Sequence, residues 1–265
     1  MSEIQEITQH LNELRIRILR IVISVGIVIA FILSFHFTPI EFSGLTLYYP
    51  EPQPLDNIAA QIVNQMRVQL VPEGVALIQT APGQAFFAQI YIAALVGIVV
   101  SMPIIVKELS GFIAPALKEH EIKVGRSIAL PALGLFVIGC VFSYVMVIPY
   151  ILDFLYQYGE SAGIVTFFNI VDFVTFVLQF LLAFGISFQL PLVMYAATVS
   201  GLTDASFWRK NIRYAIVAIV VFGAVITPDG SGVTMWFIAG PMIALYLAGM
   251  IVVERKQRQS KAIKI

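Results

Sequence analysis

The amino-acid sequence predicts an all-α membrane protein with six transmembrane helices and both termini on the cytoplasmic side. Hydrophobic residues make up 59% of the 265 residues, more than in typical soluble domains. Long stretches without Asp, Glu, Lys or Arg recur along the chain, and about 20 such residues of helix cross the hydrocarbon core of a bilayer. Between these stretches, fifteen of the sixteen lysines and arginines form clusters that can all lie on one side. Because positive charge stays on the cytoplasmic side, these clusters set the orientation.

The spans are predicted to follow one another as a single integral membrane domain of residues 1–265. They cover about residues 19–38, 86–106, 127–150, 172–199, 213–228 and 233–253. The first is expected to be an uncleaved anchor, because a polar, acidic segment precedes it and no small-residue cleavage site follows. The fifth is short, since the charge-free stretch from Tyr214 to Pro228 covers only about 22 Å at ~1.5 Å per residue. It still counts as a span, because basic Arg213 precedes it and acidic Asp229 follows it.

Residues 55–71, between the first two spans, are predicted to form an external amphipathic helix. Its apolar residues recur at helical spacing, with polar residues opposite them. They are Leu55, Ile58, Ala59, Ile62, Val63, Met66 and Leu70. We expect this helix to lie on the outer membrane surface or to cap the bundle. The segments Tyr48–Pro50 and Pro52–Pro54 before it favour a turn at the membrane interface.

No catalytic or metal-binding residues are predicted. Cys140 is the only cysteine, so neither a disulfide nor a cysteine-rich metal site is expected. The sequence has no Walker-type glycine loop, no His-Glu-x-x-His and no serine or carboxylate dyad within the spans. We therefore expect no enzyme activity, no cofactor and no nucleic-acid partner. Gln179 and Gln189 are the strongest polar groups in the middle of a span.

Two motifs lie on the predicted cytoplasmic side. One is His10-Leu11-Asn12-Glu13-Leu14-Arg15, just before the first span, and the other is Phe112-x-x-Pro115-x-Leu117 followed by His120-Glu121, between the second and third spans. Further motifs are Ala85–Phe87, Ala183–Pro191 and Gly223–Pro228. In this order, from about Thr8 to Val253, they resemble the TatC family, the multi-span core subunit of the twin-arginine protein translocase.

The resemblance implies a receptor for twin-arginine signal peptides and an assembly core of the Tat translocase. That complex exports folded proteins across the cytoplasmic membrane with the proton-motive force. The implied partners are signal peptides of folded cargo, TatA- and TatB-like single-span proteins, other copies of the same chain and the lipid bilayer. A small-solute membrane permease is the alternative function.

The signal-peptide site is expected to comprise six residues. They are Glu13, Arg15, Arg17, Phe112, Pro115 and Glu121. The carboxylates of Glu13 and Glu121 could each hold one arginine of the peptide bidentately. The residues alone leave open that Glu13 pairs with Arg17 at i,i+4, and that Glu121 only solvates its loop.

Gln189 stands where many family members carry a glutamate. As an amide it remains a strong hydrogen-bonding group in hydrocarbon. It is expected either to bond another helix of the bundle, or to contact a single-span partner or a local membrane defect. Pro191, two residues later, is expected to kink the helix.

Overall fold

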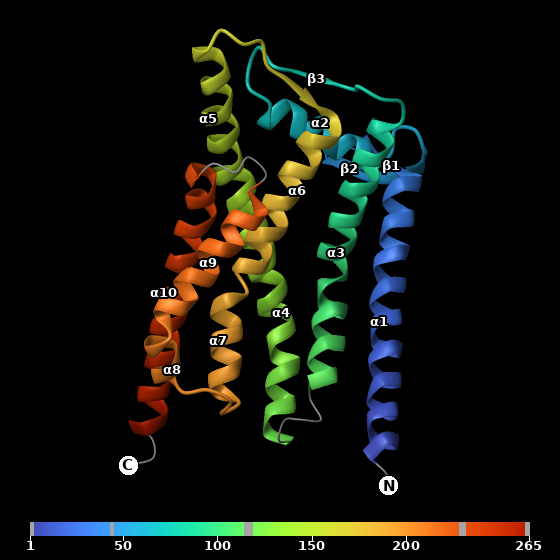
Figure 1. Cartoon of the computed structure of the whole chain (residues 1–265). Coiled ribbons are helices and arrows are strands. Elements are labelled where there is room, and N and C mark those ends of the chain that lie inside the picture. Colours follow the sequence, from blue (N-terminus) through green and yellow to red (C-terminus); the bar gives the residue numbers. More distant parts are fainter. Residues whose placement is uncertain (1–2, 43–44, 114–118, 228–231, 263–265) are drawn as a thin grey trace. The chain divides into compact units, whose positions relative to one another are not determined.

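The computed structural model describes residues 3–42, 45–113, 119–227 and 232–262 (Figure 1). It divides into two compact units. Unit 1 comprises residues 1–105 and 148–178, and unit 2 comprises residues 106–147 and 179–265. The organisation as a single membrane domain with the span limits given above stays a prediction.

Five helical stretches in the described part of the chain are long and apolar enough to cross a membrane. They are His10–Ser34, Gln84–Leu109, Leu130–Ser161, Ile170–Val199 and Gly232–Arg258. A shorter apolar helix covers Ile212–Ile226. The helical membrane class is therefore confirmed, whereas the count of six spans and the side on which the termini lie stay predictions.

In unit 1, α1 (Glu3–Ser34) and α3 (Gln84–Ile113) meet at small polar residues. The Ser24 hydroxyl donates a hydrogen bond to Ser101 Oγ at 3.0 Å. One turn earlier on α3, a Cβ on Gly97 would lie 3.1–3.2 Å from the Ile29 and Val25 side chains. The contact thus depends on a residue without a side chain and on one hydroxyl pair, which is typical of helices that associate in lipid.

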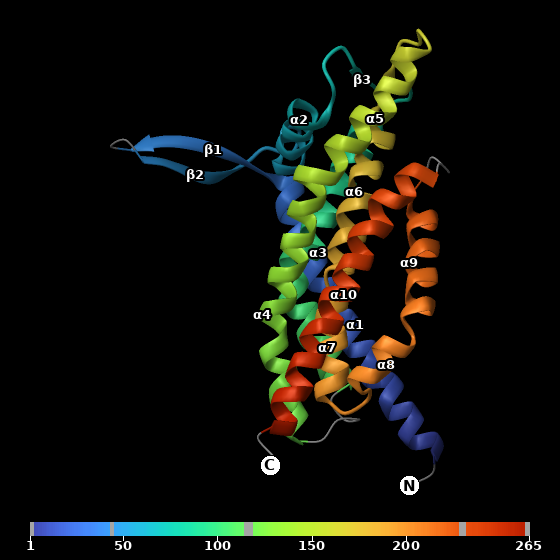
Figure 2. The ribbon, with the colours of Figure 1, turned by 90° about the vertical axis from the view of Figure 1, so that its left-hand side faces the viewer.

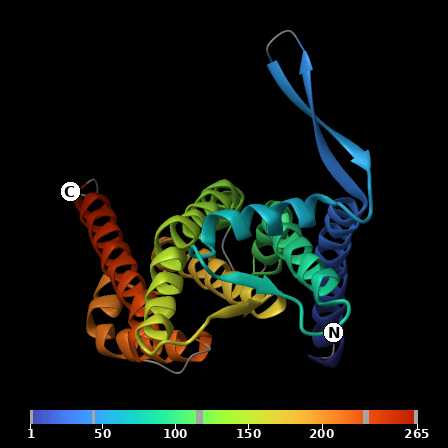
Figure 3. The same ribbon diagram turned by 90° about the horizontal axis from the view of Figure 1, so that it is seen from above.

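After α1 the chain forms a β-hairpin that the sequence did not predict. Strand β1 (Phe35–Phe42) pairs antiparallel with β2 (Leu45–Pro52). The hairpin runs sideways, across the direction of α1 (Figures 2 and 3). The expected turn at Tyr48–Pro50 is wrong, because those residues lie inside β2.

The prolines of the hairpin explain that error. The register places Pro39 opposite Tyr48, and Pro50 opposite Phe37. A proline has no N–H, so it fits only where that N–H would point away from the partner strand. The two outer edges therefore lack donors at these positions, which hinders pairing with a further strand.

Helix α2 (Ile58–Leu70) confirms that the segment between β2 and α3 holds an amphipathic helix. Asn57 caps it, because its Oδ1 accepts a hydrogen bond from the Ala60 N–H at 3.0 Å. The same side chain donates to Gln89 Oε1 at 2.9 Å and so ties the start of α2 to α3. Leu55 was wrongly assigned to the apolar face. It precedes the helix and is 94% exposed.

A second, parallel strand pair joins two loops of unit 1. Strand β3 (Ala76–Ile78) pairs with β4 (Phe167–Asn169). The Asn169 amide donates to Thr80 Oγ1 at 2.7 Å and to Gln84 Oε1 at 3.0 Å. After the third predicted span, α5 (Ile148–Ser161) keeps the chain helical beyond Tyr150.

Unit 2 contains the ends of α3 and of α6 (Ile170–Ser187). Its other helices are α4 (Glu119–Phe142), the π-helical turn Ser143–Val147, α7 (Leu190–Val199), α8 (Ala205–Lys210), α9 (Ile212–Ile226) and α10 (Gly232–Ala262). Gly139 of α4 allows the closest approach, since a Cβ there would lie 2.6 Å from the carbonyl oxygen of Phe184 on α6. The Phe142 ring packs against Phe184 and Phe188, with centroids 5.6 and 5.7 Å apart. Gln189 directly follows Phe188, so this packing lies next to it.

Candidate functional site

The amino-terminal part of α1 presents a polar face with one carboxylate and two guanidiniums. Residues three and four apart lie on the same side of a helix, so Glu13, Arg17 and Arg20 share a face. A hollow of about 410 Å³ lies against this face. The described residues that line it are Asn12, Glu13, Ile16, Arg17 and Arg20.

Glu13 and Arg17 form an ion pair. Arg17 Nη2 donates to Glu13 Oε1 at 2.6 Å, and Arg17 Nε donates to the same oxygen at 3.0 Å. The other carboxylate oxygen, Oε2, accepts no hydrogen bond from the described part of the chain. Because both side chains are partly exposed, we expect this pair to contribute only about 0.3–0.5 kcal/mol, as is usual for i,i+4 pairs. The pair that the sequence left open thus exists, and it is weak enough to rearrange around a ligand.

Of the remaining predicted site residues, Arg15 is the one whose side chain the structure describes. Arg15 is exposed and, two residues from Glu13, lies on a different side of α1. Phe112 belongs to the last turn of α3, but its side chain lies outside the described residues, as do Pro115 and the side chain of Glu121. Their roles stay predictions.

The sequence did not single out three of the residues that line the hollow, namely Asn12, Ile16 and Arg20. Helical spacing from Glu13 could have identified Ile16 and Arg20, since they follow it by three and seven residues. Asn12 lies within the His10–Arg15 motif, and its amide adds a further hydrogen-bonding group to the polar face.

Gln189 lies at a break in the fourth apolar helical stretch. Helix α6 ends at Ser187 and α7 begins at Leu190, with Pro191 in its first turn. The kink expected from Pro191 is therefore confirmed as an interruption. Proline cannot donate the helical hydrogen bond, and its ring clashes with the preceding turn.

The Gln189 amide is held in one orientation by two carbonyl groups. Its Nε2 donates to Ala132 O on α4 and to Gly185 O on α6, each at 3.2 Å. Carbonyl oxygens only accept, so Nε2 must face them and Oε1 must point elsewhere. Oε1 is not buried, and no described residue donates to it. The expected bond to another helix exists, and the side chain also presents an acceptor at the surface of unit 2.

The described residues contain no group of three or more His, Cys, Asp or Glu side chains that could hold a metal ion.

Comparison with known proteins identifies the family. A family model described as Sec-independent protein translocase protein (TatC) matches residues 9–241. A protein named Sec-independent protein translocase protein TatC from Cenarchaeum symbiosum is 67% identical over 262 residues, which cover 99% of each chain. One of the same name from Aquifex aeolicus is 31% identical and covers 97% of this chain and 98% of its own. A crystal structure of the twin arginine translocase receptor TatC superposes with a TM-score of 0.74 at 27% identity, covering 92% of this chain and 98% of that one. The chain is thus a multi-pass membrane protein of a transport family rather than an enzyme, and it belongs to the TatC family of Sec-independent protein translocases.

Proposed function

We propose that this chain is the receptor for twin-arginine signal peptides and the core on which the translocase assembles. The observation that carries the proposal is the polar face of α1, where the Glu13 carboxylate lines a hollow and its Oε2 accepts no hydrogen bond from the described residues. The family assignment decides against the small-solute permease.

The proposed recognition starts from the charge of the peptide. A guanidinium offers its N–H groups in a planar fork that matches a carboxylate, whereas the ammonium of lysine is a compact point charge. We propose that one peptide arginine binds Glu13 through Oε2. This binding does not require Arg17 to give up its hydrogen bonds to Oε1. In the same proposal, Glu121 holds the second arginine, Arg15 helps to shape the site, and Phe112 and Pro115 fix the form of the loop.

The proposed partners within the membrane are TatA- and TatB-like single-span proteins. We infer that Gln189 offers its Oε1 to a donor on such a partner, because both N–H groups already bind the chain's own carbonyls. Transport would use the proton-motive force, which supplies about 2.3 kcal/mol per charge per 100 mV.

A signal peptide with a photoreactive group beside its arginine pair tests the proposed function. We expect it to crosslink to the purified chain in detergent, and the attachment sites to include the amino-terminal part of α1. The matched Lys-Lys peptide should crosslink far less, because it lacks the planar fork. Equal crosslinking by both peptides would contradict a twin-arginine receptor.

Gln189→Leu tests the proposed contact within the membrane. The substitution keeps the bulk and removes the amide, so we expect protein export to fall while signal-peptide crosslinking is retained. Gln179→Leu is the matched control, because it removes an exposed amide from the same apolar stretch. If export by Gln189→Leu is undiminished, the amide serves only the bond between α4 and α6, and the partner contact is wrong.

A further inference from the structure

We propose that the β1–β2 hairpin is a membrane-interface anchor, seated in the zwitterionic headgroup layer at the end of α1. The proposal concerns a lipid-binding surface and does not depend on signal-peptide recognition. It rests on where the hairpin starts, how its root is fixed, which of its edges are closed, and what its faces and charges present.

The position of the hairpin follows from the chain itself. Phe35 begins β1 directly after Ser34, the last residue of the apolar helix α1. A chain that leaves a spanning helix emerges in the headgroup layer. The hairpin then runs across the direction of α1, as Figures 2 and 3 both show, and its strands of eight residues extend about 25 Å at ~3.3 Å per residue. It can therefore lie along the membrane surface instead of rising from it.

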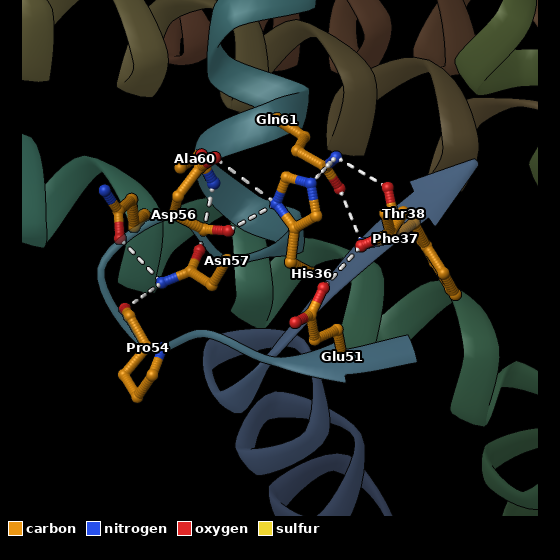
Figure 4. A network of polar contacts seen from close by, with 10 residues as sticks. His36, Phe37, Thr38, Glu51, Pro54, Asp56, Asn57, Ala60 and Gln61 are labelled. Atoms are coloured by element: carbon orange, nitrogen blue, oxygen red, sulfur yellow. Dashed lines mark hydrogen bonds and ion pairs between the residues drawn. The ribbon is translucent and has the colours of Figure 1, made fainter. Parts of the chain in front are cut away.

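The root of the hairpin is fixed to α2 by the side chain of Gln61 (Figure 4). The Phe37 N–H donates to Gln61 Oε1 at 3.2 Å, and Gln61 Nε2 donates to Phe37 O at 3.1 Å. The Gln61 amide thus makes both hydrogen bonds that a neighbouring strand would make with Phe37, on the outward edge of β1. Since an N–H only donates and a carbonyl only accepts, the amide has one orientation, and its Nε2 also lies 3.1 Å from His36 Nε2.

His36 completes the root. Its Nε2 must accept from the Gln61 amide, so in a neutral imidazole Nδ1 carries the proton. Nδ1 lies 2.6 Å from Asp56 O, to which it donates, and 3.4 Å from Asp56 Oδ2. These bonds join β1 to the residues just before and within α2, so the hairpin leaves α1 in a defined direction.

The edges of the hairpin disfavour a further strand as its partner. On β1, Gln61 occupies the outward groups of Phe37, and Pro39 has no donor at the next outward position. On β2, Pro50 and Pro52 lack donors in the same way. The hairpin of a second copy is thus a poor partner, and any ligand must contact the faces.

Both faces present large apolar side chains. Opposite residues of an antiparallel pair lie on one face, so Ile40, Leu47 and Tyr49 share one side, and Phe37 and Tyr48 the other. All five are exposed, and Tyr48 most of all at 66%. An exposed two-stranded hairpin of this composition is poorly suited to water. Tyrosines favour the interface, where the ring is in an apolar layer and the hydroxyl remains hydrated.

The backbone groups of the hairpin limit how deeply it can lie in the membrane, and its charges indicate which lipid headgroups suit it. Among the described residues, no strand lies beside the outward N–H and C=O groups near Thr46 and Tyr48. This rules out the hydrocarbon core, where such groups find no partner. The headgroup layer supplies both water and donors. Residues 35–52 include Glu41 and Glu51 and no Lys or Arg, so anionic lipids would repel the hairpin and zwitterionic lipids suit it.

An environment-sensitive probe on the hairpin tests the anchor. The full chain carries Cys140→Ala and a single cysteine, Thr46→Cys, labelled with a nitrobenzoxadiazole dye, in nanodiscs that hold one copy and phosphatidylcholine. Thr46 is exposed on β2, and Ser161→Cys, exposed at the end of α5, is the matched control. We expect a blue-shifted emission for the Thr46 probe, and stronger quenching by nitroxides near the headgroup than by nitroxides deep in the acyl chains. The Ser161 probe should resemble a dye in water.

Three outcomes with the two labelled sites would overturn the anchor. The first is a Thr46 probe as hydrated as the Ser161 probe. The second is shielding that occurs only in discs with two copies, which would assign the surface to self-association. The third is shielding that increases when phosphatidylglycerol replaces phosphatidylcholine, which would contradict the charge argument. As a further variant, Tyr48→Ser with Tyr49→Ser should reduce the shielding, while Gln61 still fixes the root. Unchanged shielding in that variant would also overturn the proposal.

Discussion

Glu13→Ala is expected to lower the affinity for a twin-arginine signal peptide by about thirtyfold or more. The bound peptide is expected to cover this face and to shield the pair of Glu13 and the peptide arginine from water. Removing one partner of a shielded charge pair costs about 2–5 kcal/mol, because the other charge loses its counter-ion on binding. Glu121→Ala should act similarly on the second arginine. Both residues lie outside the charge-free stretches, so insertion and folding should be retained. Binding isotherms of a labelled peptide to purified variants measure the effect.

The matched controls separate recognition from general charge effects. Glu254→Ala also removes a carboxylate that pairs with an arginine, Arg209, but on α10 in unit 2. It should bind the peptide normally. Glu13→Gln keeps a hydrogen-bonding group of the same size and should still bind weakly, because the charge is lost. Normal affinity in both alanine variants, with Arg-Arg still preferred over Lys-Lys, would rule out the carboxylate clamp.

Gly139→Ala is expected to have the largest effect on stability. The new Cβ would lie 2.6 Å from Phe184 O and 3.0 Å from the Phe188 ring, and a backbone carbonyl cannot move aside without shifting α6. Overpacking of this kind typically costs about 1–3 kcal/mol. We expect a lower midpoint of thermal unfolding in detergent, measured by the loss of monodisperse protein on heating.

Gly134→Ala is the control for that experiment. It lies in the same helix, five residues earlier, and no atom lies within 4 Å of its added Cβ. It should leave the midpoint unchanged or raise it, since alanine is the better helix former. Equal midpoints for both variants would mean that α4 and α6 can separate at Gly139 without cost.

Elements with strong periodicity could be predicted from the sequence, whereas short elements that depend on distant partners could not. Charge-free stretches predicted the long apolar helices, and helical spacing predicted α2. Strand β3 has three residues and pairs with β4, whose residues lie 91 positions further along the chain. A pattern within so few residues carries no signal of its own. In the hairpin, the prolines suggested a turn. Only the strand register shows that the positions of their missing N–H groups face outward, where a strand tolerates proline.

The candidate site could be predicted only in part for a similar reason. The motif contains Glu13, and the i,i+4 spacing named a pair with Arg17 as one of two possibilities. That Oε1 accepts both bonds while Oε2 accepts none from the described residues is a matter of rotamer, which the sequence does not specify. Likewise, the sequence shows an amide at position 189. Only the structure shows the two carbonyl groups, of Ala132 and Gly185, to which that amide donates.

The hydroxyl pair between Ser24 and Ser101 also helps to set the rotation of α1 about its own axis. Only 6% of the most apolar window of this helix is buried, so few contacts besides the packing at Gly97 and the link to the hairpin resist turning. Glu13 lies eleven residues before Ser24, or about 16 Å along the axis at ~1.5 Å per residue. One residue of slippage at the serines would turn the carboxylate by roughly 100°. The angular position of the Glu13 face is therefore tied to a contact about three turns further along the same helix.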